Sequence, residues 1–143
     1  MITVLSILRQ KGRDVFHIAP DATVLDALRE MAAHNCGALV VLEGNTPLGV
    51  FSERDYARKV VLMGRTSRQT IVRDVMNAPV IDVTPDACVY RCMSLMTEHR
   101  CRHLLVMNHG ELAGVISIGD VVKAVIDDQQ STIDQLGHYI TGT

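Results

Sequence analysis

The chain of 143 residues is long enough for one compact domain, or for two small units that share a core. Apolar residues make up 48% and charged residues 21%, which is ordinary for a globular protein, and the formal charge is −2. That charge and the 3% of aromatic residues argue against nucleic acid or an anionic membrane as a partner, because those partners need clustered basic or stacking side chains.

The four cysteines do not indicate a disulfide framework, because the chain is long and apolar enough to fold without one. The first residues lack the basic and long apolar segments of a secretory signal. The longest unbroken apolar run, Ala38–Leu42, is far too short to span a membrane. We therefore expect a cytoplasmic location.

The first elements are read in chain order. Val15–Ile18 alternates before Pro20 and predicts a short strand. Thr23 is the expected N-cap of a helix, because apolar residues recur after it at helical spacing until Asn35–Gly37. Ala38–Leu42 predicts a buried strand, which a turn at residues 43–47 joins to the strand Leu48–Ser52. Ser52 is placed to cap a helix that runs to Met63.

The same pattern returns 65 residues later. From residue 15 to 60 the offset holds without a gap, and it matches Pro20-Asp21-Ala22 with Pro85-Asp86-Ala87 and Asp55 with Asp120. The second copy predicts a strand at 80–83, a helix from Asp86 to His99, strands at 103–107 and 112–117, and a helix at 118–126. An internal repeat of this size indicates two copies of one supersecondary unit.

These elements predict an α/β (α+β) fold of two βαββα repeats related by a pseudo-twofold. One repeat is too small to cover its own sheet, so the two should cover each other and leave two equivalent clefts. The expected boundaries are 1–63 for repeat 1 with an N-terminal helix, 64–76 for a linker with a short amphipathic turn at 71–76, 77–127 for repeat 2, and 128–143 for a C-terminal helix or tail. The helix expected at 129–139 would dock elsewhere, on a second subunit for example.

Two matching segments carry the chemistry: Gly49-Val50-Phe51-Ser52-Glu53-Arg54-Asp55 and Gly114-Val115-Ile116-Ser117-Ile118-Gly119-Asp120. Each is a strand that ends in Ser and turns into a helix with Asp three residues later. A helix N-terminus suits a phosphate, and an Asp carboxylate can accept both hydroxyls of a ribose. Ser-x-x-Asp is also an ordinary helix cap. The Gly three residues before each Ser, kept in both copies, favours a ligand over a cap alone.

The duplicated pattern, preceded each time by Pro-Asp-Ala, an amphipathic helix and an apolar strand, resembles the cystathionine β-synthase (CBS) domain pair. The resemblance covers residues 11 to about 126. The chain is similar to small stand-alone CBS-pair proteins. It implies an adenosyl ligand such as AMP, ADP, ATP, NAD(H) or S-adenosylmethionine, held in two clefts that each take residues from both copies.

Carried over residue by residue, the resemblance implies two binding sets. The first combines Val15, Phe16, Cys36, Gly37 and Ala38 with Ser117, Gly119 and Asp120, and Lys11 could reach its phosphate. The second combines Val80, Ile81, Cys101, Arg102 and His103 with Ser52, Arg54 and Asp55. Since the second set gathers two arginines and a histidine, we expect it to bind the phosphate end of a nucleotide more strongly.

We therefore predict a regulatory adenine-nucleotide sensor that is not an enzyme and acts on a partner protein. Two alternatives stay open, a structural dimerisation module with vestigial clefts and a nucleotide-processing enzyme. No catalytic residues and no metal are expected, because no triad, Walker or zincin motif occurs.

Several further residues fit bland structural roles. His34 and His99 are expected at helix ends, near free carbonyls. Cys88 and Cys92 are expected as core or half-buried thiols, and Cys36 and Cys101 as small apolar lining of the clefts. The apolar run Val60–Met63 is too wide for one buried stripe, so a homodimer interface is its simplest cover.

Overall fold

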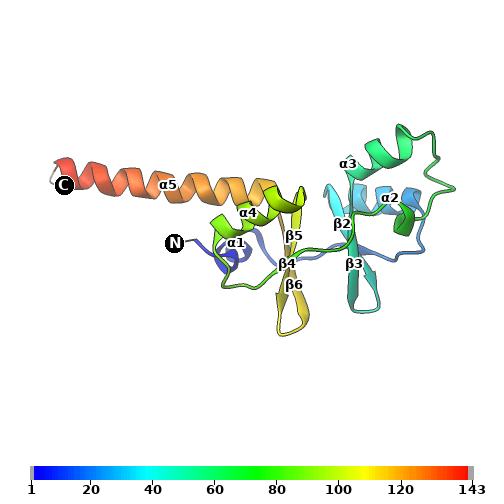
Figure 1. Cartoon of the computed structure of the whole chain (residues 1–143), viewed down its shortest axis with the longest axis horizontal. Helices are drawn as coiled ribbons and strands as arrows, with labels where there is room; N and C mark the ends of the chain where they lie inside the picture. The colour runs from blue at the N-terminus through cyan, green and yellow to red at the C-terminus, as the bar shows by residue number, and fades with distance from the viewer. Residues whose placement is uncertain (1, 142–143) are drawn as a thin grey trace. The chain divides into compact units, whose positions relative to one another are not determined.

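The computed structural model describes residues 2–141, and these form two compact units. Unit 2 is the continuous stretch Asp14–Val80, whereas unit 1 combines the chain up to Arg13 with the chain from Ile81 onward. Each unit contains one copy of the βαββα repeat, so the predicted α/β fold of two repeats is confirmed (Figure 1).

Unit 2 contains a three-stranded sheet in the order β1-β2-β3. Strand β1 (His17–Ile18) runs parallel to β2 (Ala38–Glu43), which pairs antiparallel with β3 (Thr46–Ser52). Helix α2 (Val24–His34) packs on this sheet. Helix α3 (Glu53–Asp55) follows β3 and continues as the π-helix η1 (Tyr56–Val61), and a 3₁₀ turn, η2 (Val72–Asp74), follows the linker. The core contains Leu39, Val41 and Phe51 of the sheet.

Unit 1 repeats this arrangement in the order β4-β5-β6. Its strands are β4 (Asp82–Val83), β5 (His103–Asn108) and β6 (Glu111–Ser117), and helix α4 (Val89–His99) precedes β5. Helix α4 begins three residues later than predicted, because residues 84–87 form a turn and Cys88 takes the N-cap position that Thr23 has in unit 2.

Helix α1 (Val4–Lys11) belongs to unit 1, although the sequence boundaries grouped it with the first repeat. Its Leu8 fills the space in front of Gly114 on β6, where a Cβ atom would lie 2.8 Å from the leucine. In unit 2 the segment after η2 fills the same place, since a Cβ on Gly49 would lie 2.7 Å from the Asn77 carbonyl oxygen. The close approach expected at both glycines is therefore an internal packing contact.

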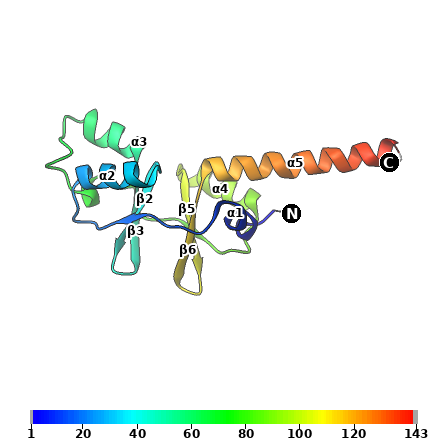
Figure 2. The same cartoon turned by 180° about the vertical axis from the view of Figure 1, so that it is seen from behind.

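Helix α5 runs without interruption from Ile118 to Thr141, and so the two separate helices predicted at 118–126 and 129–139 are one. No proline lies between them to end the first one. Figures 1 and 2 show α1 and α4 beside the first half of α5, while its second half extends beyond them. Side chains from 129 to 140 are accordingly exposed.

Candidate functional site

In unit 2, most candidate binding residues meet at one edge of the sheet. Ala38, the first residue of β2, pairs with Ser52, the last residue of β3, and the Glu53 backbone N–H donates to the Gly37 carbonyl at 3.0 Å. This places Cys36, Gly37, Ala38, Ser52, Arg54 and Asp55 around the point where β3 turns into α3. We call this the Asp55 edge.

The Asp55 carboxylate is held tightly at this edge. Its Oδ2 accepts hydrogen bonds from the Ser52 backbone N–H and hydroxyl, both at 3.0 Å, and the Asp55 N–H donates to Ser52 Oγ at 3.2 Å. Lys59 Nζ lies 3.3 Å from Oδ1. The side chain of Asp55 is only 13% exposed.

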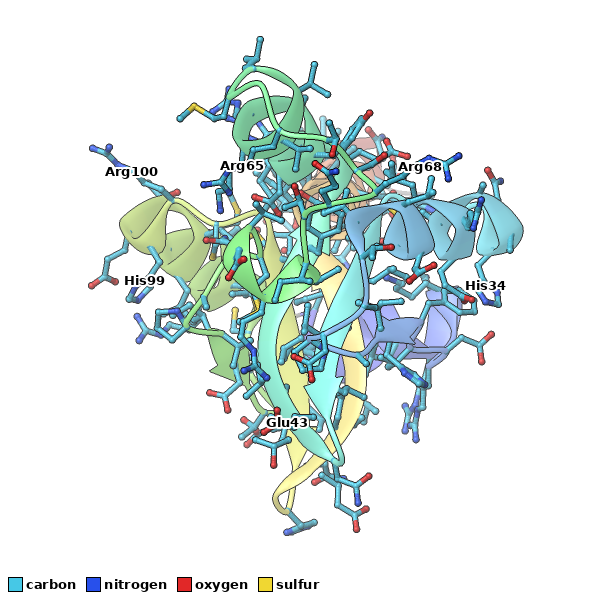
Figure 3. The ribbon with its side chains drawn as sticks, turned by 90° about the vertical axis from the view of Figure 1, so that its right-hand side faces the viewer. His34, Glu43, Arg65, Arg68, His99 and Arg100 are labelled. Carbon is cyan, nitrogen blue, oxygen red and sulfur yellow. The ribbon has the colours of Figure 1, made fainter. Side chains whose placement is uncertain are left out.

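The strand predicted at Val15–Ile18 is shorter in the structure: Val15 and Phe16 precede β1, which is one of the two edge strands of the sheet. The Phe16 carbonyl accepts a hydrogen bond from the Val40 N–H at 3.0 Å, which ties this segment to β2. The Phe16 ring stacks on His34, with centroids 4.1 Å apart. His34 Nε2 also lies 3.2 Å from Glu30 Oε2, so this histidine contacts side chains in addition to its position in the last turn of α2 (Figure 3).

Unit 1 forms the equivalent edge from the second copy. His103 pairs with Ser117, and the Ile118 N–H donates to the Arg102 carbonyl at 2.8 Å. Cys101 and Gly119 lie beside these residues in the chain. The Ile81 carbonyl accepts a hydrogen bond from the Leu105 N–H, as Phe16 does from Val40. We call this the Asp120 edge. The last candidate, Val80, is the half-buried final residue of unit 2.

Asp120 differs from Asp55 in the lysine that it contacts. Its Oδ2 accepts from the Ser117 N–H at 2.8 Å and from Lys11 Nζ, also at 2.8 Å, and Lys11 donates to the Val115 carbonyl at 2.9 Å as well. Lys11 comes from α1, whereas Lys59 lies on the same helical segment as Asp55.

These contacts set the charge of the Asp120 edge. Burial acts to raise the pKa of the Asp120 carboxyl, but hydrogen bonds from Lys11 and Ser117 and the charge of Lys11 outweigh it and hold the pKa below its usual 3.8. Asp120 is therefore ionised at neutral pH, as an acceptor of two hydroxyl hydrogen bonds must be.

Both Ser-x-x-Asp segments also act as helix caps. Ser52 and Asp55 form a capping box, and Ser117 and Asp120 make the same two reciprocal hydrogen bonds. The cap interpretation is confirmed at both edges, and the packing at Gly49 and Gly114 removes the glycines as support for a ligand. What remains at each edge to contact a ligand is the Asp carboxylate and the residues at the start of the middle strand.

All four cysteines are free thiols. Cys92 is buried in the core of unit 1, and Cys88, Cys36 and Cys101 are half-buried free thiols. Burial raises the pKa of Cys92 to about 11. Among residues 2–141 no three His, Cys, Asp or Glu side chains gather closely enough to hold a metal ion.

Comparison with known families identifies this pattern. The family model of the CBS domain matches the chain twice, over residues 6–62 and 72–127. The chain belongs to the CBS domain family. Both Ser-x-x-Asp edges lie within the matched CBS repeats.

Two relatives show how closely other CBS proteins correspond to the whole chain. The mitochondrial CBS domain-containing protein CBSX3 of Arabidopsis thaliana is 39% identical over 98% of this chain and 72% of its own length. The solved structure of a putative signal-transduction protein with CBS domains from Burkholderia ambifaria is 48% identical, covers 90% of this chain and 96% of its own, and superposes with a TM-score of 0.83.

A third CBS protein has been solved with a ligand. This protein, from Pyrobaculum aerophilum, was determined in complex with AMP; it is 28% identical over 83% of this chain and 89% of its own, with a TM-score of 0.72.

In this chain, none of the described helices is long and apolar enough to cross a membrane.

Proposed function

We propose that this chain is a regulatory module that binds an adenine nucleotide at its Asp55 and Asp120 edges, modulates a partner protein and performs no catalysis of its own. The observation that carries the proposal is the duplication of one geometry. In both units an ionisable Asp follows three residues after the Ser that ends a strand. Each Asp carboxylate accepts a hydrogen bond from the backbone N–H of that Ser. The relative bound to AMP supports adenine nucleotides as the ligand class.

The role proposed for each carboxylate is to accept ribose hydroxyls. A carboxylate already oriented by backbone hydrogen bonds loses little further freedom when a ligand binds. The first residues of the middle strand, 36–38 and 101–103, would contact the base, and Val15, Phe16, Val80 and Ile81 would line it. That each nucleotide takes residues from both repeats, as the family resemblance implies, stays a prediction.

The proposal is tested by titrating AMP, ATP and NADH into the wild-type chain and into Asp55→Asn, Asp120→Asn and the double variant, by calorimetry and thermal shift. A ligand that binds only the folded state raises Tm. Asp26→Asn is a matched control, because Asp26 completes the capping box of Thr23 on α2 without belonging to either edge. The double variant should lose binding and the control should keep it.

Three results would count against the proposal. If no nucleotide changes Tm, the structural alternative with vestigial clefts is favoured. If the added nucleotide is turned over during the titration, the enzyme alternative is favoured. Undiminished binding by the Asp55→Asn, Asp120→Asn double variant would contradict the role of the two carboxylates.

We further propose that the set containing Asp55, Arg54, Arg102 and His103 prefers the phosphate end of the ligand. Charge-assisted hydrogen bonds are about twice as strong as neutral ones. Arg54→Ala and Arg102→Ala should each weaken AMP binding more than adenosine binding. Unchanged AMP affinity in both variants would contradict the preference.

The quaternary state that we propose is a homodimer, and the location is the cytoplasm. Support for the dimer comes from exposed apolar side chains on α5, where Ile126, Ile133, Leu136 and Ile140 are 58%, 60%, 56% and 81% exposed. With Gln129 they follow the alternating three- and four-residue spacing of a coiled-coil seam. Of the apolar run Val60–Met63, Val60 is buried in the core of unit 2, whereas Val61, Leu62 and Met63 are exposed, as a cover by another subunit would require.

A further inference from the structure

Unit 1 contains a pocket of about 420 Å³. The pocket lies at the end of the sheet where β5 turns into β6. Its lining includes Leu5 and Leu8 of α1, Arg13 after that helix, Asp86 after β4, Asn108 at the end of β5, and Ala113 on β6. The volume falls within the range of small-molecule sites in proteins.

The pocket is separate from the nucleotide edge of the same unit. The Asp120 edge lies where β5 begins, at His103, and the pocket lies where β5 ends, at Asn108. Five residue steps of an extended strand separate these ends by about 16 Å. A ligand in the pocket therefore contacts none of the residues assigned to nucleotide binding.

In unit 2 the Arg73 side chain occupies the corresponding position. The Arg73 N–H donates to the Pro20 carbonyl at 3.0 Å, as the Leu5 N–H donates to the Pro85 carbonyl at 2.9 Å, so these two residues are equivalent. The Arg73 guanidinium lies 2.9 Å from Glu43 and 3.6 Å from Asp21. Figure 3 labels Glu43 toward the hairpin end of the unit 2 sheet.

Three substitutions between the copies open this place in unit 1. Leu5 stands where unit 2 has Arg73, and Asn108 stands where it has Glu43. Both sheets bulge at the same point, and the extra residue is Leu48 in unit 2 but the smaller Ala113 in unit 1, between Gly114 and Leu112. Asp86 keeps the acidic character of Asp21, without the guanidinium that Asp21 contacts.

The pocket lining combines both charges with an apolar floor. Arg13 is exposed and makes no hydrogen bond or ion pair with the described residues. Thr84 donates to one oxygen of Asp86, and the other oxygen accepts nothing from the part of the chain described. Leu5 and Leu8 supply the floor.

We propose that this pocket binds a free α-amino acid with an apolar side chain. Arg13 would bind its carboxylate through a guanidinium fork, and Asp86 would bind its ammonium group, with the Asn108 amide oxygen as a second acceptor. The aliphatic side chain would lie on Leu5, Leu8 and Ala113, where its burial is favourable. In effect the ligand ammonium takes the place that the guanidinium of Arg73 has in unit 2.

The test is calorimetry of the full chain with L-valine, L-leucine and L-methionine. Two analogues of leucine separate the charges: 4-methylpentanoate lacks the ammonium group, and isoamylamine lacks the carboxylate. At least one amino acid should bind, and loss of either charge should weaken binding about tenfold or more. Arg13→Gln and Asp86→Asn should each have an effect of the same size, and Leu5→Arg should close the pocket with a guanidinium.

Asp21→Asn, at the equivalent position of unit 2, is the matched control and should bind as the wild type does. The proposal is overturned if none of the three amino acids binds at millimolar concentration, if 4-methylpentanoate or isoamylamine binds as tightly as leucine, or if Arg13→Gln and Asp86→Asn bind unchanged. These two variants alter exposed residues and decide the matter even if Leu5→Arg does not fold. AMP affinity, measured on the same variants, should stay at the wild-type value, which separates this test from that of the nucleotide edges.

Discussion

Lys11 Nζ lies 2.8 Å from Asp120 Oδ2, although 109 positions separate the two residues in the chain. The contact joins the end of α1 to the beginning of α5. It fixes a carboxylate that belongs to the proposed nucleotide site. The lysine that fixes it comes from α1, which lies outside the βαββα repeat.

Replacing Lys11 by glutamine should lower stability in a pH-dependent way. Because the folded-state pKa of Asp120 is below its usual 3.8, its contribution is complete above that pH and is lost as the pH falls through the folded value. At pH 7 the free energy of unfolding of the wild type should exceed that of Lys11→Gln by about 1 kcal/mol or less, because Lys11 is partly exposed. This difference should shrink below about pH 4.

Urea unfolding of both proteins at neutral and acidic pH measures this difference. Lys123→Gln, on the exposed side of α5, is the control and should behave as the wild type does. A Lys11→Gln variant with the same stability difference at both pH values would contradict the ionic origin of the contribution.

Adding a methyl group to the two equivalent glycines should have unequal effects. A Cβ on Gly49 meets the backbone oxygen of Asn77, which accepts a hydrogen bond from the Val50 N–H and would lose it by moving away. A Cβ on Gly114 instead meets the end of the Leu8 side chain. Gly49→Ala should therefore cost about 2–3 kcal/mol and Gly114→Ala about 1 kcal/mol. Thermal unfolding measures both, and Leu8→Ala combined with Gly114→Ala should show a favourable coupling. Equal losses at the two glycines would disagree with this packing.

The N-caps of α2 and α4 offer a second matched pair. Thr23 caps α2 through a hydrogen bond from the Asp26 N–H, whereas the Cys88 side chain makes no capping hydrogen bond on α4. Thr23→Ala should destabilise the protein by about 1 kcal/mol, and Cys88→Thr should stabilise it by up to about the same amount. The midpoint of denaturant unfolding gives both values. A loss of stability in Cys88→Thr would show that packing of the thiol outweighs the missing cap.

The exposed stripe of α5 should control self-association. Ile133→Glu and Leu136→Glu place charges on the proposed dimer seam, where burial of an unpaired carboxylate is unfavourable. Light scattering should show a dimer for the wild type and a monomer for the variants, with unchanged circular dichroism. Gln135→Glu, at a position outside the apolar stripe, serves as control. Variants that remain dimeric would exclude this seam, and a monomeric wild type would exclude the dimer.

Local signals predicted much of each repeat. Thr23 and Ser52 were identified as N-caps, and both are, because a cap needs only a side-chain oxygen and the helix that follows. The break at Asn35–Gly37 is confirmed too, since Asn35 adopts the left-handed conformation that ends α2. The strands Ala38–Glu43 and His103–Asn108 follow from their continuous apolar runs.

Contacts between distant segments could not be predicted in the same way. No pattern near Leu8 indicates that it packs on Gly114, and none near Lys11 indicates its contact with Asp120. That Lys11 reaches a phosphate stays a prediction. Within each unit the strand pairing brings Ala38 to Ser52 and His103 to Ser117. The two binding sets, which join residues 36–38 with Asp120 and residues 101–103 with Asp55, stay predictions, as does their nucleotide.

The division of the chain between the two units has a consequence for synthesis on the ribosome. Unit 2 is continuous from Asp14 to Val80 and can fold as soon as it emerges, whereas α1 is made first and meets Gly114 and Asp120 only after most of the chain exists. During that interval the apolar face of α1, with Val4, Ile7 and Leu8, has none of its final neighbours from β6 and α5. Nascent chains stalled before residue 114 should therefore carry a helix that is free to be captured by chaperones, and release beyond the start of α5 should protect it.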